Sequence, residues 1–163
     1  MIRSGTRNEK TIVNADLPMT FLHQQQGKDK PVLIFLHGYT DNGPALLRRC
    51  FSEPDLRFEV LAPNGLFPTP LKAGNGWKEA YSWYFVDFDS NTVIVPADIA
   101  IKAIKELIEK LELTDREKIV VGFSQGGFLV PKLLPVLKNV KKVIGIGCGY
   151  RVGEYPDSPH FTV

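Results

Sequence analysis

The chain has 163 residues, 44% of them hydrophobic, and its 20 basic and 18 acidic residues leave a formal net charge of +2 at pH 7. This length fits one domain, and the nearly neutral charge argues against a nucleic-acid or membrane-surface partner. The apolar runs are too short to span a bilayer and residues 1–10 lack the apolar core of a secretory signal, so we expect no stable membrane insertion and a cytoplasmic location.

The first part of the chain predicts a strand pair, a buried strand and a helix. Residues 11–25 read as two strands around the turn "DLPM". The run "VLIFLHG" (32–38) is continuously apolar and stops at a glycine, which is typical of a strand buried on both faces of a parallel sheet. Residues 40–51 favour a short helix that either Asp41 or Asn42 caps.

A strand, a long insertion and an amphipathic helix follow. "FEVLAP" (58–63) predicts the next strand, and residues 64–92 form an insertion rich in glycine, proline and aromatic residues. In residues 96–113 the apolar positions recur at helical spacing, with lysine and glutamate on the opposite face.

The last part alternates strand, helix and strand, over residues 117–123, 125–138 and 141–149. Strands that alternate with helices predict a single α/β domain over residues 1–163, with a mostly parallel sheet and helices on both of its faces.

The two cysteines and three histidines show no metal-binding spacing. Cys50 and Cys148 lie far apart and form no CxxC pair, so we expect two buried thiols rather than a disulfide or a metal site. His23, His37 and His160 are equally scattered, and no metal is expected.

The stretch "IVVGFSQGGF" (119–128) has the form G-x-S-x-G, with Gly122, Ser124 and Gly126 at the fixed positions. A strand leads into it and a helix should begin just after the serine. A strand-to-helix turn this tight would strain the backbone of Ser124 and lift its hydroxyl above the sheet, as in a nucleophile elbow. The alternative is an ordinary glycine-rich loop with a helix-capping serine.

A second loop, "LHGYTDNG" (36–43), also follows a buried strand. Gly38 would let the chain turn so that the backbone N–H of Tyr39 faces the crevice, and the N–H of Gln125 would be a second donor. Two such donors form an oxyanion hole. His37 could be the catalytic base, but a histidine beside an oxyanion glycine more often packs to hold its loop.

The segments "FLHGYTDN", "APNG", "GW…SWYF" and "GFSQGG", in this order from Val32 to Tyr150, resemble the phospholipase/carboxylesterase family of small α/β-hydrolases, which includes acyl-protein thioesterases. The resemblance implies an α/β-hydrolase fold, with Ser124 as the nucleophile and Tyr39 and Gln125 as oxyanion donors. It also implies hydrolysis of small-molecule carboxylic esters or thioesters through an acyl-enzyme, without a cofactor.

Two segments depart from this family. The family's helix after the nucleophile is usually rich in small residues and free of proline, whereas Pro131 and Pro135 predict a kink or early break near Lys132. The insertion crowds aromatic residues into 77–88, either as the wall of an acyl pocket near the active site or as loop packing. Trp83 is the best candidate for a substrate-binding residue.

The base and acid that a serine nucleophile needs are hard to find in the sequence. After Ser124 the candidates are Glu154, Asp157 and His160, and the last two stand only three residues apart, which makes a local dyad a minor alternative. The family takes its acid and histidine from loops after the next two strands, and residues 160–163 look like the opening of the first of these.

These patterns predict a hydrolase domain truncated after the sixth core strand, without its acid and histidine. A complementing C-terminal fragment or a swapped copy could supply them. The favoured interpretation is a serine esterase or thioesterase. The alternatives are a catalytically silent, hydrolase-like binding module, an inactive fragment, and a purely structural domain, which would leave both loop motifs unexplained.

Overall fold

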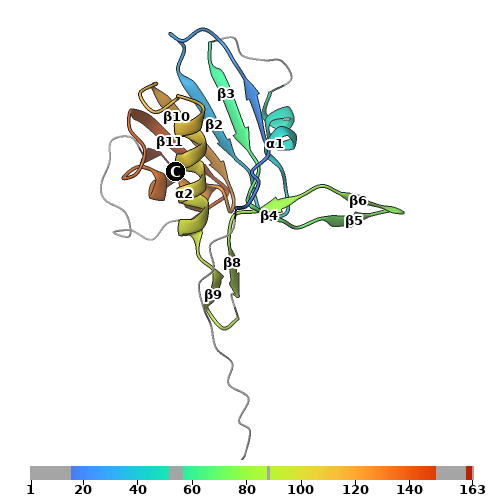
Figure 1. Ribbon diagram of the computed structural model, residues 1–163. Helices are drawn as coiled ribbons and strands as arrows, with labels where there is room; N and C mark the ends of the chain where they lie inside the picture. The colour runs from blue at the N-terminus through green and yellow to red at the C-terminus, as the bar shows by residue number, and fades with distance from the viewer. Residues whose placement is uncertain (1–15, 52–56, 88, 150–160, 163) are drawn as a thin grey trace, which may run out of the picture.

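A six-stranded sheet forms the centre of the protein (Figure 1), whose computed structural model describes residues 16–51, 57–87, 89–149 and 161–162. In spatial order the strands are β1 (Phe21–Gln24), β3 (Glu59–Pro63), β2 (Val32–Leu36), β10 (Lys118–Phe123), β11 (Val140–Ile146) and β12 (Phe161–Thr162). β1 pairs antiparallel with β3, and every other pairing in this sheet is parallel. The short β12 confirms that a strand begins near residue 160.

Helices cover both faces of the sheet, as predicted (Figure 1). Alternate residues of β2 point to opposite faces: Ile34 packs in the core that includes α2 (Ala97–Lys110) and α3 (Val130–Leu133), and Phe35 packs in the core beneath α1 (Gly43–Cys50). All five residues of β2 are buried. This two-sided burial explains why its sequence is continuously apolar rather than alternating.

The N-terminus of α1 shows which of two candidate residues caps the helix. The Asn42 side chain accepts a hydrogen bond from the Ala45 N–H at 2.8 Å, so Asn42 is the N-cap. Asp41 forms an ion pair with Arg49 instead.

The insertion after β3 folds into three small antiparallel ribbons. They are β4 (Phe67–Pro68) with β7 (Tyr81–Ser82), β5 (Leu71–Ala73) with β6 (Gly76–Lys78), and β8 (Phe85–Asp87) with β9 (Thr92–Val95). The β5–β6 and β8–β9 hairpins project from the body of the molecule (Figure 1). The Tyr81 N–H donates to the Asp41 carbonyl at 2.8 Å, which ties the insertion to the loop after β2.

The second strand of the pair expected over residues 11–25 is present as β1, which pairs with β3. The first strand of that pair falls on residues 11–15, which lie outside the described part of the chain. The expectation of two buried thiols is wrong. Neither cysteine is buried: Cys50 ends the solvent-exposed last turn of α1, and Cys148 is half-buried after β11. The two cysteines form no disulfide with each other.

The helix after β10 breaks early, as its prolines predict. A short 3₁₀ turn (Gly127–Leu129) runs into α3, which ends at Leu133. Pro131 lies in the first turn of α3, where the helix needs no N–H donor, whereas Pro135 could not donate to continue the helix.

At the amino-terminal end of β10, the fully buried Lys118 joins three carbonyl groups. Its Nζ donates to the carbonyls of Thr114, Arg116 and Lys138 at 2.7, 2.6 and 3.0 Å. An ammonium group with three donors matches three acceptors, so Lys118 joins the turn before β10 to the turn before β11 at the amino-terminal end of these parallel strands.

Replacing Lys118 with methionine should therefore destabilise the fold, because it leaves three carbonyls without the donor that Lys118 provides and places an apolar side chain among them. We expect the Lys118→Met change to lower the free energy of unfolding by about 2–3 kcal/mol in urea denaturation. Lys105→Met is the control: Lys105 forms an exposed pair with Glu109, and its loss should cost about 0.5 kcal/mol or less. Equal effects of the two changes would contradict this account.

Candidate active site

Ser124 occupies a strained turn directly after β10. Its φ is +48°, in the left-handed region that residues other than glycine rarely adopt, at a cost of about 1–2 kcal/mol. Its N–H donates to the Ile146 carbonyl at 2.7 Å, and its own carbonyl accepts from the Phe128 N–H at 3.2 Å. Hydrogen bonds on both sides thus hold the turn in this conformation.

The glycines of the motif are required by close packing of backbone on backbone. A Cβ atom added to Gly122 would lie 2.3 Å from the Gly126 carbonyl oxygen, and one added to Gly126 would lie 2.3 Å from the Leu36 carbonyl oxygen. The Gly126 N–H also donates to the His37 carbonyl at 3.1 Å. The turn therefore rests directly on the end of β2.

Two backbone amides beside the serine are unengaged. The N–H groups of Tyr39 and Gln125 donate to no other residue in the described part of the chain. The loop that carries Tyr39 reaches the serine, because a Cβ added to Gly38 would lie 3.4 Å from the Ser124 Cβ. Both amides thus belong to the two segments that meet at Ser124.

His37 is fully buried and both of its ring nitrogens are occupied. Nδ1 lies 2.7 Å from the Gly38 carbonyl oxygen and must donate to it, and Nε2 accepts from the Gly65 N–H at 2.8 Å. This pattern requires the neutral ring. Burial lowers the pKa of His37 from 6.5 to about 4, with the Gly38 carbonyl partly opposing the shift. His37 therefore holds its loop and is not available as a base for Ser124.

Trp83 differs from the expectation for a pocket residue. Its side chain has no exposed surface, its Nε1 donates to the His37 carbonyl at 2.8 Å, and its ring packs against the His37 ring at 4.8 Å between centroids. Trp83 is thus a support behind the loop after β2. The sequence could not separate it from its neighbours, because adjacent aromatic residues in an irregular segment carry no period.

The side chain of Gln125 joins the turn to the aromatic segment, a role that sequence reasoning missed. Its Oε1 accepts from the Trp83 N–H and its Nε2 donates to the Tyr84 carbonyl, each at 2.9 Å. Gln125 therefore carries an unengaged backbone amide, while both ends of its side-chain amide are hydrogen-bonded to the aromatic segment.

A cavity of about 340 Å³ opens over the serine. Aromatic and aliphatic side chains line most of it, and its lining residues are Tyr39, Tyr84, Phe85, Val86, Ser124, Gln125 and Phe128. Three of the four site residues expected from the sequence, all but Trp83, thus meet at one cavity. The Ser124 hydroxyl forms no hydrogen bond with another described residue, so it is free to meet a ligand.

The loop after β2 also carries one charged group. Burial opposes the ionised form of Asp41, but its hydrogen bonds to the Arg49 guanidinium outweigh this effect, and the pKa of Asp41 lies below its ordinary value. Asp41 is therefore an ion-pair partner that fixes the loop to α1.

No histidine of the described residues is free to assist Ser124. His23 binds Glu59 at 2.6 Å, and Glu59 also pairs with Arg116 at 3.1 Å. Glu59 begins β3, whereas Ser124 follows the carboxyl end of the parallel strand β10, so this cluster lies at the opposite edge of the sheet.

The remaining candidates, Glu154, Asp157 and His160, lie outside the described residues. Within residues 16–51, 57–87, 89–149 and 161–162, no three histidine, cysteine or acidic side chains are grouped as metal ligands.

The buried, neutral His37 predicts that the stability of the fold depends on pH. Between pH 6.5 and about 4 the unfolded chain binds a proton at His37 that the folded protein does not, so stability is lost as the pH falls through this window. The loss should approach the order of 3 kcal/mol at pH 4. Urea denaturation at several pH values should show this slope reduced in His37→Gln, and identical slopes in both proteins would disprove the assignment.

The packing of Gly126 predicts a second effect. A Gly126→Ala change forces a methyl group against the Leu36 and His37 carbonyls, and we expect it to lower the free energy of unfolding by about 3 kcal/mol. Gly76→Ala is the matched control, because its added Cβ would meet its nearest neighbour only at 4.0 Å. Thermal unfolding of both variants tests the difference, and a fully tolerated alanine at 126 would refute it.

Comparisons with known proteins identify a family and related folds. The phospholipase/carboxylesterase family matches residues 17–152. A comparison with curated proteins found no match. No helix among the described residues has the length and apolar character that crossing a bilayer requires.

Solved structures share the fold at low sequence identity. A variant of the N-acyl homoserine lactonase AidH, complexed with N-hexanoyl homoserine lactone, is similar at 16% identity and a TM-score of 0.55 over 84% of this chain and 44% of its own. An α/β-hydrolase from Novosphingobium aromaticivorans is similar at 16% identity and a TM-score of 0.53, over 79% of this chain and 39% of its own. The carboxylesterase of Bacillus cereus is similar at 21% identity and a TM-score of 0.50, over 81% of this chain and 60% of its own.

The chain thus spans between 39% and 60% of the length of these three proteins. Its sheet order, helices on both faces and tight turn after β10 accord with the α/β-hydrolase fold. Because the family match covers most of the chain, this protein belongs to the phospholipase/carboxylesterase family of α/β-hydrolases.

Proposed function

We propose that the protein is a serine hydrolase that cleaves carboxylic esters or thioesters of small molecules through an acyl-enzyme on Ser124. The observation that carries this proposal is the strained serine itself. A residue at φ +48° is retained at an energetic cost, and here the strain presents a hydroxyl to an apolar cavity. A helix-capping serine would need no such conformation.

In the proposed reaction, Ser124 Oγ attacks the carbonyl carbon of the substrate. The amides of Tyr39 and Gln125 donate to the oxygen on which negative charge develops, and one such donor typically contributes about 10²–10³ in kcat. The alcohol or thiol then leaves, and water hydrolyses the acyl-enzyme.

The hydroxyl proton needs a base. His37 is excluded by its two hydrogen bonds and His23 by its position, so the proposal requires an imidazole from outside the described residues. His160, a further segment, a complementing fragment and a swapped copy are the sources to be tested. The cytoplasmic location also stays a prediction.

Active-site labelling tests the nucleophile. A fluorophosphonate should label the wild-type protein and not Ser124→Ala, and hydrolysis of p-nitrophenyl butanoate should fall by on the order of 10³ or more in that variant. Ser90→Ala is the control, because Ser90 is an exposed serine in the β8–β9 turn. Labelling that persists without Ser124, or that never occurs in the wild type, would reject the proposal.

A second candidate is a binding module that keeps the cavity without turnover. Both described histidines, His23 and His37, already have hydrogen-bond or ion-pair partners, so neither is available as a catalytic base, and this favours a binding module. It predicts that wild type and Ser124→Ala bind octanoate equally well in calorimetry and that neither hydrolyses any ester. Measurable turnover by the wild type that depends on Ser124 excludes it.

A further inference from the structure

The cavity over Ser124 has a neighbour. A second cavity of about 320 Å³ lies against the β8–β9 hairpin and the beginning of α2. It is lined by Tyr84, Val86, Val93, Val95, Pro96, Ala97, Asp98, Phe128 and Lys132. Tyr84, Val86 and Phe128 line both cavities, so these three side chains form the wall between them.

Phe128 is the part of this wall that is fixed to the reactive turn. Its N–H donates to the Ser124 carbonyl at 3.2 Å, which sets the residue one short turn beyond the serine. Its side chain is 38% exposed, although phenylalanine is usually buried, because it stands between two open spaces.

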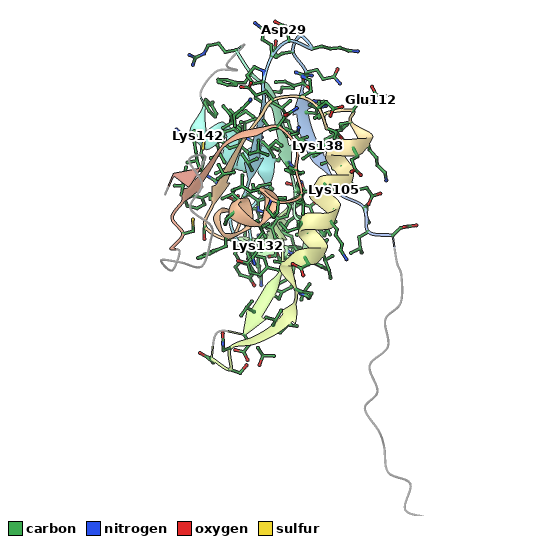
Figure 2. The ribbon with its side chains drawn as sticks, turned by 90° about the vertical axis from the view of Figure 1, so that its left-hand side faces the viewer. Asp29, Lys105, Glu112, Lys132, Lys138 and Lys142 are labelled. Atoms are coloured by element: carbon green, nitrogen blue, oxygen red, sulfur yellow. The ribbon has the colours of Figure 1, made fainter. Side chains whose placement is uncertain are left out.

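The second cavity is apolar inside and charged at its rim. Val93, Val95 and Ala97 offer hydrocarbon surface, whereas Asp98 and Lys132 are exposed charged residues. In Figure 2, Lys132 lies toward the end of the molecule from which the β8–β9 hairpin projects, and Asp29 and Glu112 lie toward the opposite end. A hydrocarbon chain could gain burial inside this cavity but would meet charge and water at its rim.

We propose that Phe128 determines the acyl length that the site accepts, and that the protein acts on esters or thioesters of short- to medium-chain acids. This proposal rests on the proposed hydrolase function. The acyl chain lies in the first cavity against Tyr84, Val86 and Phe128. The phenyl ring closes the path into the second cavity, which the distal methylenes of a longer chain would otherwise fill.

The test compares kcat/KM for p-nitrophenyl butanoate, octanoate and dodecanoate. In Phe128→Ala the ratio of dodecanoate to butanoate should rise at least about tenfold, because each buried methylene contributes roughly a factor of four. Phe128→Leu should shift the ratio in the same direction by less, and it keeps the test valid if the alanine variant folds poorly.

Two further variants separate this role from a general loosening of the fold. Adding Val95→Phe to Phe128→Ala refills the second cavity from β9 and should return the ratio of dodecanoate to butanoate toward its wild-type value. Phe21→Ala removes a phenylalanine of similar exposure, 41%, on the edge strand β1 and should leave the ratio unchanged.

An unchanged ratio in Phe128→Ala and Phe128→Leu, with butanoate still hydrolysed, would overturn the proposal. If the wild type hydrolyses no ester, the proposed function fails. Calorimetric binding of the free acids then tests separately whether Phe128 limits the length of the chain that the cavity accepts. Tighter binding of dodecanoate relative to butanoate in Phe128→Ala supports the role of Phe128, and an unchanged ratio of dissociation constants rejects it.

Discussion

The site depends on the direct contact between the backbone of the G-x-S-x-G turn and the end of β2. No side chain fits between Gly126 and the carbonyls of Leu36 and His37, so the distance between these segments is set by the peptide backbone alone. The His37 carbonyl accepts from both the Gly126 N–H and the Trp83 indole. One oxygen atom thus joins the turn, the loop after β2 and the aromatic segment. The strain at Ser124 can persist because all three of these segments hold it in place.

Features governed by local chemistry could be predicted from the sequence. The buried strand at 32–38, the amphipathic helix at 96–113 and the break caused by Pro131 and Pro135 each follow from a periodicity or a missing donor within a few residues. The glycine spacing around Ser124 likewise indicated a tight turn, because only a close approach of backbone requires glycine at both positions.

Features that depend on distant contacts could not be predicted. Trp83 and Tyr84 are adjacent and chemically alike, yet one is buried behind a loop and the other lines the cavity. Trp83 packs in the core and donates a hydrogen bond to the carbonyl of His37, which is far away in the sequence. Cys50 was expected to be buried because thiols usually are, but the exposure of its helix end decides its environment. The pairing of β1 with β3 is a long-range contact of the same kind.

The early helix break has a consequence for the shape of the site. A long regular helix after β10 would continue the 3.6-residue repeat, whereas here a 3₁₀ turn precedes a single short turn of α-helix. Phe128 belongs to this tighter turn, where residues three apart are eclipsed rather than staggered. The aromatic ring beside Ser124 is therefore a result of the local helix geometry as much as of residue type.

Gln125 connects the turn at Ser124 to the aromatic segment. Its side chain forms hydrogen bonds with the peptide groups of Trp83 and Tyr84, while its own backbone belongs to the turn. A displacement of the Tyr84 segment would therefore either move the residue next to Ser124 or break both of these hydrogen bonds. Under the proposed function, a bulky acyl group that displaced this segment would also disturb the alignment of Ser124, so selectivity for substrate shape would come from the geometry of the turn as well as from the space in the cavity.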